Sequence, residues 1–143
     1  IPAVARAKAE SGVHNAKKTG LYYAALGFVP LFGYYILLFC FPGFAAKLLL
    51  NENYPQYPQI VSYLRPFVFI GIVGYIANVL IAVLNGMSMS RTNFIAQMAN
   101  VTATLLIGLP LTYMLGVYGQ IYGGLLATLA LLTATVLLFI RAK

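Results

Sequence analysis

The sequence predicts an all-α fold, a polytopic membrane bundle with four transmembrane helices. Of its 143 residues, 62% are hydrophobic and only 8% are charged, and the mean hydropathy is +0.87. Soluble domains carry about 25% charged residues, so this chain has too few polar groups to cover the surface of a soluble core. Four apolar stretches without any charge are also close to the roughly 20 residues that cross a bilayer as a helix.

The first element is a basic, alanine-rich segment at residues 1–20. We predict that it is a cytoplasmic linker or interfacial helix, interrupted at Gly12. The first transmembrane helix follows at 21–41, where Pro30 should bend it because proline removes a backbone hydrogen bond. Residues 42–62 begin with a short apolar turn or helix and continue into a segment rich in Pro, Tyr and Asn. These residues are predicted to form an external loop.

The second half of the chain contains the other three spans, separated by short connections. Because only a few residues separate the last two spans, we expect them to form a tight helical hairpin. Pro110 lies within the third span and should bend it. In order, we predict a transmembrane helix at 63–87, a cytoplasmic loop at 88–93, a helix at 94–115, a tight external turn at 116–119, a helix at 120–140 and a cytoplasmic end at 141–143.

The basic residues predict the orientation of the spans. Only Lys47 and Arg65 fall on the side of the 42–62 loop. The opposite side carries seven basic residues, Arg6, Lys8, Lys17, Lys18, Arg91, Arg141 and Lys143. Cytoplasmic loops carry an excess of Lys and Arg, so both ends should face the cytoplasm in a multi-pass protein of the inner (plasma) membrane.

The excess of Lys and Arg at the cytoplasmic side also accounts for the net charge of +7. The basic residues are scattered at the edges of apolar runs and do not gather in one patch, so we expect membrane lipid as a partner and no nucleic acid.

Small residues recur on one face of the fourth helix. Gly119, Gly123 and Ala127 are spaced by four residues, which places them within an arc of about 80° at 100° per residue. In a bilayer, helices associate through close packing, and small residues let two backbones approach. We therefore predict that this GxxxG-type face packs against a neighbouring helix.

Similar stripes mark the second and third helices, where they carry amides as well. One gathers Gly71 and Gly74 with Asn78 and Asn85, and the other contains Gln97 and Asn100. Such stripes should point into the bundle, because an amide facing lipid has no hydrogen-bond partner. Gly71 and Gly74 are predicted packing residues. For the four amides two interpretations stay open: hydrogen bonds between helices, or the lining of a hydrated transport cavity.

Residues for enzymatic or metal chemistry are sparse. The only acids, Glu10 and Glu52, lie outside the predicted spans, so no carboxylate pair or membrane proton relay can form from this segment. A single His14 and a single Cys40 do not complete a metal site. We expect no enzyme activity, no catalytic residue, no metal and no cofactor. Arg65 and Arg91 are candidates for contact with phosphate head groups, or serve as topology signals and lipid anchors.

Four segments, taken in order, resemble one transporter family. They are IPAVARAKAESG, FPGFAAKLLLNENYPQY, LIAVLNGMSMSRTNFIAQ and LTYMLGVYGQIYGGLLATL, the last with Gly123, Gly124, Ala127 and Thr128 in matching places. The chain resembles the C-terminal portion of the polysaccharide biosynthesis, or lipid-linked oligosaccharide flippase, family of the multidrug/oligosaccharidyl-lipid/polysaccharide exporter superfamily. It departs from that pattern at Gln120, where the family has a glycine, and in the MSMS that separates Gly86 from Arg91.

The resemblance implies a function without covalent chemistry. Members of this family have about 12 to 14 helices in two lobes that alternate access around a central cavity. The chain would then be a fragment supplying the last helices of the second lobe, with the remaining helices of the transporter and an undecaprenyl-pyrophosphate-linked glycan as partners. Two alternatives remain: a drug/cation antiporter of the same superfamily, and a small membrane assembly subunit without transport activity.

Overall fold

The computed structural model describes residues 2–51 and 59–142, and these residues are almost entirely helical. The elements in order are α1 (Pro2–Cys40), α2 (Pro42–Leu50), α3 (Ile60–Gly86), α4 (Ser90–Ala103), the π-helical turn η2 (Thr104–Gly108), α5 (Leu109–Leu115) and α6 (Val117–Arg141). Four helical stretches are long and apolar enough to cross a membrane: α1, α3, α4 continued through η2 and α5, and α6. The predicted all-α class with four spanning helices is confirmed.

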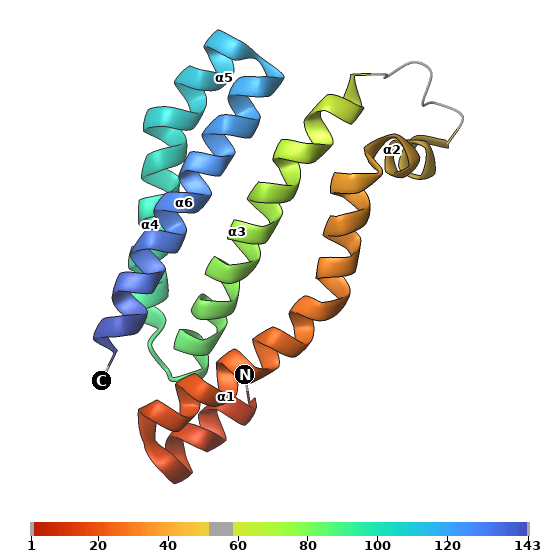
Figure 1. The fold of residues 1–143 in the computed structure, drawn as a ribbon. Coiled ribbons are helices and arrows are strands. Elements are labelled where there is room, and N and C mark those ends of the chain that lie inside the picture. The colour runs from red at the N-terminus through yellow and green to blue at the C-terminus, as the bar shows by residue number, and fades with distance from the viewer. Residues whose placement is uncertain (1, 52–58, 143) are drawn as a thin grey trace.

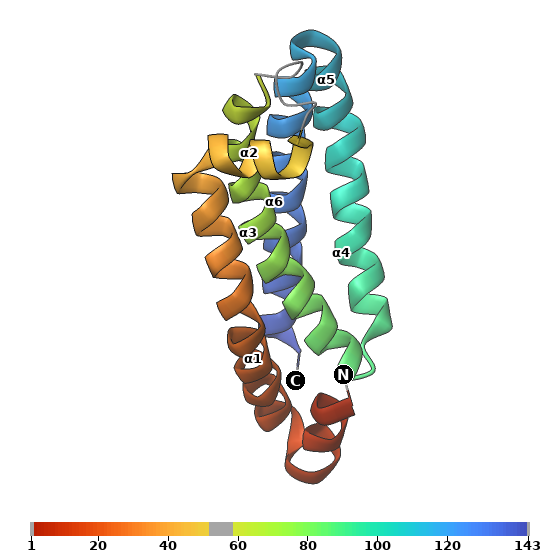
Figure 2. The same ribbon diagram turned by 90° about the vertical axis from the view of Figure 1, so that its right-hand side faces the viewer.

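The four spans lie side by side in a curved layer (Figure 1). α1 packs on α3, α3 on α6, and α6 on α4, η2 and α5. α1 and α4 form the two edges and make no contact with one another in the described part of the chain. In a view turned by 90°, α1 lies on one side and α4 on the other, and α3 crosses in front of α6 between them (Figure 2). This arrangement leaves large apolar side chains exposed on each of the four spans.

α1 contains a sharp reversal near its N-terminus. Gly12 has φ 82° and ψ 179°, a conformation open essentially only to glycine. The chain before Gly12 therefore folds back beside the chain after it, and we call residues 2–20 the N-terminal hairpin (Figure 1). Val4 and Ala16 of this hairpin are buried against the end of α3. The interruption predicted at Gly12 is thus a turn between two helical arms.

The third span contains a π-helical turn, η2, in its middle. In η2 the amide of Leu109 donates to the carbonyl of Thr104, five residues earlier. Pro110 follows closely, and a proline both lacks an N–H and pushes against the carbonyl four residues before it. A single π turn is a common way to absorb such a disruption. The third span thus departs from regular α-helix just before Pro110, while the bend predicted at Pro110 stays a prediction.

Several boundaries differ from the sequence prediction. The short apolar turn or helix predicted at the start of residues 42–62 is a helix, α2, whose first position is Pro42, where proline suits a helix start. The turn predicted at 116–119 is reduced to Gly116, because one glycine at φ 59° reverses the chain and α6 begins at Val117. α4 begins at Ser90, inside the predicted 88–93 loop. Residues 52–58 of the external loop lie outside the described residues.

Candidate functional site

α6 approaches α5 and η2 at two glycines. Gly119 and Gly123 are buried on α6. A Cβ atom at Gly119 would overlap the backbone carbonyl of Leu111 and lie 2.8 Å from the amide nitrogen of Thr112. A Cβ atom at Gly123 would lie 2.6 Å from the Cα atom of Gly108. Backbone meets backbone at both positions, and neither can carry a larger side chain without moving a helix.

The glycine face continues along α6 beyond the η2 contact. Ala127, the third predicted packing residue of this stripe, is 3% exposed. Nearby, Ala77 and Ile81 of α3 pack with Ala96 of α4 and Leu131 of α6 in one buried cluster. α6 is therefore the central helix of this half of the layer, because it is held by α3 on one side and by α4 on the other.

The predicted stripe of small and polar residues on α3 does not face a single neighbouring helix. A Cβ atom at Gly71 would lie 2.6 Å from the Tyr35 hydroxyl of α1. At Gly74 it would make an ordinary contact of 3.6 Å with Thr128 of α6. Asn78 differs from the expected inward orientation, because it is exposed and its Nδ2 donates to the carbonyl of Gly74 at 2.8 Å. An open layer leaves this side of α3 without a neighbour, so the amide turns back to its own helix.

The other three predicted amides are less exposed than Asn78. Asn85, Gln97 and Asn100 are half-buried. The backbone carbonyl of Asn100 accepts a hydrogen bond from the Thr104 hydroxyl at 2.9 Å. None of the four predicted amides lines either of the grooves described below. Their role as lining of a cavity stays a prediction.

Arg65 and Arg91 lie at opposite ends of the layer. Arg65 is exposed near the start of α3, with its Cζ atom 6.0 Å from the ring centroid of Phe39. Arg91 is exposed at the start of α4, near the two chain ends (Figure 1). Each is accessible to a phosphate group at its own surface. Their separation means that the two guanidinium groups cannot hold one head group together.

Two lysines of the N-terminal hairpin bind the ends of α3 and α6. Lys8 donates from Nζ to the carbonyl of Met87, the C-cap residue that follows α3, at 2.6 Å. Lys17 donates to the carbonyls of Phe139 and Ala142 at the end of α6, at 2.7 and 2.8 Å. The last carbonyls of a helix lack partners within the helix and carry partial negative charge. Both lysines therefore act as helix caps, a role that the sequence reasoning missed.

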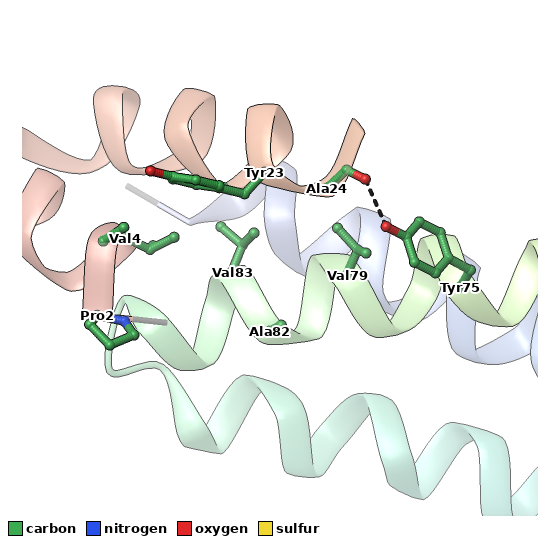
Figure 3. Close-up of a pocket in the computed structure, with 10 residues that line it drawn as sticks. Pro2, Val4, Tyr23, Ala24, Tyr75, Val79, Ala82 and Val83 are labelled. Carbon is green, nitrogen blue, oxygen red and sulfur yellow. Dashed lines mark hydrogen bonds between the residues drawn. The ribbon is translucent and has the colours of Figure 1, made fainter. Parts of the chain in front are cut away.

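A groove of about 600 Å³ separates the first half of α1 from the end of α3. We call it the α1–α3 groove. Val79, Ala82 and Val83 form one wall, and Tyr23 and Ala24 of α1 face them (Figure 3). At one end the Tyr75 hydroxyl donates to the carbonyl of Ala24 at 2.7 Å, which ties the two helices together. Pro2, Ala3 and Val4 of the N-terminal hairpin line the other end.

A second groove lies between α3 and the hairpin of α5 and α6. It has a volume of about 720 Å³ and combines aromatic side chains of α3 with hydroxyls and an amide from the hairpin. We call it the α3–α5 groove. The hydroxyls of Thr104 and Thr112 both donate to backbone carbonyls four residues earlier in the same span, those of Asn100 and Gly108. Its residues include Tyr63, Phe67, Ile70, Thr104, Gly108, Thr112, Gln120 and Gly124.

These arrangements offer binding surfaces. Among residues 2–51 and 59–142, no three His, Cys, Asp or Glu side chains come together to hold a metal ion. Cys40 is exposed at the end of α1. The grooves present apolar walls with scattered hydroxyls, a lining suited to alkyl chains and amphipathic molecules. Tyr75 at the α1–α3 groove was not singled out from the sequence, where it reads only as an aromatic residue of a span.

Comparisons with protein-family models, with curated proteins and with solved structures gave no match to this chain.

Proposed function

We propose that this chain is the C-terminal part of a membrane flippase or exporter that translocates lipid-linked polysaccharide or oligosaccharide precursors by alternating access. The observation that carries the proposal is the open layer of four apolar helices. Large apolar side chains are exposed along both edge helices, including Phe32 and Val29 on α1 and Leu106 on η2. Such a layer is suited to packing against the remaining helices of a larger helical lobe.

The close contact between α5 and α6 fits a mechanism in which groups of helices move together. Alternating access proceeds largely by rocking of one rigid bundle against another. At Gly119 and Gly123 the backbone of α6 lies directly against the backbones of α5 and η2. In the proposed transporter this hairpin moves as one unit with α3, and substrate passes over a face of the layer without covalent chemistry.

The proposed location is the inner (plasma) membrane, with both ends in the cytoplasm. The two ends of the described chain and the connection between α3 and α4 lie at the same end of the layer (Figure 1). That end carries Arg6, Lys8, Lys17, Lys18, Arg91 and Arg141. A concentration of basic residues at one membrane surface favours the cytoplasmic side.

Deletion of the full-length gene tests the proposed function. We expect loss of surface glycan and accumulation of its lipid-linked precursor, both restored by the intact gene. Unchanged glycan together with increased sensitivity to cationic drugs would favour an antiporter instead. Unchanged glycan with loss of a membrane complex would favour an assembly subunit.

A further inference from the structure

The α1–α3 groove combines an apolar lining with a cationic mouth. Arg6 lines a hollow of about 380 Å³ together with Pro2 and Ala3, the same two residues that line the end of the groove. Its side chain is 81% exposed, and its Nε lies 3.8 Å from Glu10 Oε1 in a loose ion pair. The guanidinium group is therefore open to an additional anion beside the entrance of the groove.

The length of the groove matches the part of an acyl chain that lies nearest to its head group. It follows α3 from Val83 to Tyr75, eight residues that correspond to about 12 Å at 1.5 Å per residue. Half of the hydrocarbon core of a bilayer is about 15 Å deep. The groove therefore extends from the end of the helical layer to most of the depth of one leaflet, where the Tyr75–Ala24 hydrogen bond closes it.

The positive charge at the Arg6 end of the groove favours an anionic head group. Of the basic residues of the N-terminal hairpin, Lys8 and Lys17 bind backbone carbonyls, whereas Arg6 and Lys18 are exposed. Glu10 is the only acid among the described residues at this end. An anionic phosphate at the mouth would add charge-assisted hydrogen bonds to Arg6, while a zwitterionic head group would bring its own cation close to the same cluster.

We propose that the α1–α3 groove binds an anionic phospholipid of the surrounding leaflet, with one acyl chain along Val79 and Ala82, the wall residues of α3 that are open to it, and the phosphate at Arg6. This proposal does not depend on the proposed transport function, because it concerns a bilayer lipid and not the cargo. The bound lipid fills the groove beside the direct contact that Val4 and Ala16 of the N-terminal hairpin make with α3.

Brominated phospholipids test the proposal, because bromine quenches tryptophan fluorescence only at short range and the chain contains no tryptophan. The reporter is Tyr23→Trp, placed at the groove wall, in the purified chain reconstituted in vesicles. Brominated phosphatidylglycerol is compared with brominated phosphatidylcholine. The matched reporter is Tyr122→Trp, which is exposed on α6 away from this groove. We expect stronger quenching by phosphatidylglycerol at position 23 and equal quenching by the two lipids at position 122.

Two further variants separate the phosphate contact from the groove itself. Arg6→Gln should reduce the preference for phosphatidylglycerol at position 23 by about five-fold, the factor for one basic residue near an anionic surface. Arg91→Gln, at the same end but outside the groove, should leave the preference unchanged. Ala82→Phe, at an exposed position of the groove wall, should lower quenching by both lipids, whereas Ile76→Phe on another face of α3 should not.

Three results would overturn the proposal. Equal quenching by both lipids at position 23 would mean an ordinary lipid-facing surface. Absence of quenching at position 23, with normal quenching at position 122, would mean that another protein segment fills the groove. A preference that survives Arg6→Gln would place the phosphate elsewhere. Circular dichroism of each variant checks that the helices form, and native mass spectrometry of the unmodified chain gives an independent count of retained phosphatidylglycerol.

Discussion

The Nζ atom of Lys17 lies 2.7 Å from the carbonyl oxygen of Phe139, and the same ammonium group is 4.9 Å from the centroid of the Phe139 ring. These two residues are separated by 122 positions in the sequence. One side chain of the N-terminal hairpin thus holds the last turn of α6 through its charge, its hydrogen bonds and the aromatic face. The contact joins the N-terminal hairpin of α1 to the end of α6, at the end of the layer where both chain ends lie.

Replacing Lys17 by methionine should loosen the end of α6. The variant keeps a similar apolar stem and removes the hydrogen bonds to Phe139 and Ala142. Hydrogen bonds that involve a charged group contribute about 1.5–3 kcal/mol, so amide exchange in the last turn of α6 should accelerate about ten-fold or more. Lys18→Met, at an exposed position next in sequence, is the control. Equal exchange in the two variants would contradict the capping role.

Gly119→Ala should destabilise the α5–α6 hairpin. The added Cβ atom overlaps the backbone of Leu111, which cannot rotate away as a side chain would. Overpacking of this kind costs about 1–3 kcal/mol, measured as a lower free energy of unfolding in detergent. Gly124→Ala is the matched control, since its nearest contact is Ile70 Cδ1 at 3.9 Å. A loss of stability in the control equal to that of Gly119→Ala would show that the close approach is not the cause.

Gly12→Ala should weaken the N-terminal hairpin. A Cβ atom meets nothing within 4 Å at this position, so the cost is conformational only. An alanine at φ 82° is strained by about 1–3 kcal/mol, and we expect faster proteolysis of residues 2–20. Gly33→Ala, which also meets nothing within 4 Å but lies in regular helix, should stabilise the chain by up to about 1 kcal/mol. Opposite signs for the two variants are the expected result.

The proposed orientation predicts a labelling pattern. In a Cys40→Ala background, a cysteine at Asn53 should react with an impermeant maleimide added to intact cells. A cysteine at Ser90 should react only after the membrane is opened, because the positive-inside rule places it in the cytoplasm. The reverse pattern would invert the topology, and labelling of both positions from outside would contradict the crossing by α3.

The sequence was sufficient to predict the four spans, because hydrophobic length is a direct requirement of the bilayer. It was not sufficient for the direction in which each stripe points. Periodicity gives the angle between Gly74 and Asn78 on one helix, but the neighbours of that helix decide which of them is covered. Asn78 is exposed for this reason, although Gly74 contacts α6.

The same limit applies to the lysines and to the grooves. The sequence around a lysine at the edge of a span does not distinguish a side chain that faces water from one that faces lipid head groups or the carbonyls of another helix. Lys8 and Lys17 were therefore predicted only as topology signals, while the fold makes them helix caps. Likewise, the role of Tyr75 in tying α3 to α1 is seen only in the fold, where its hydroxyl donates to the carbonyl of Ala24.

The wide turn at Thr104–Gly108 has a consequence for sequence variation in this chain. A π turn holds one residue more than the α-helix that it interrupts, so α4 and α5 are related as if one residue had been inserted between them. Deleting a single residue within 104–108 should restore regular winding without rotating α4 against α5. Deleting one within Ser90–Ala103 should turn every preceding side chain by about 100°, away from α6. Natural length variation in this span should therefore concentrate at the turn.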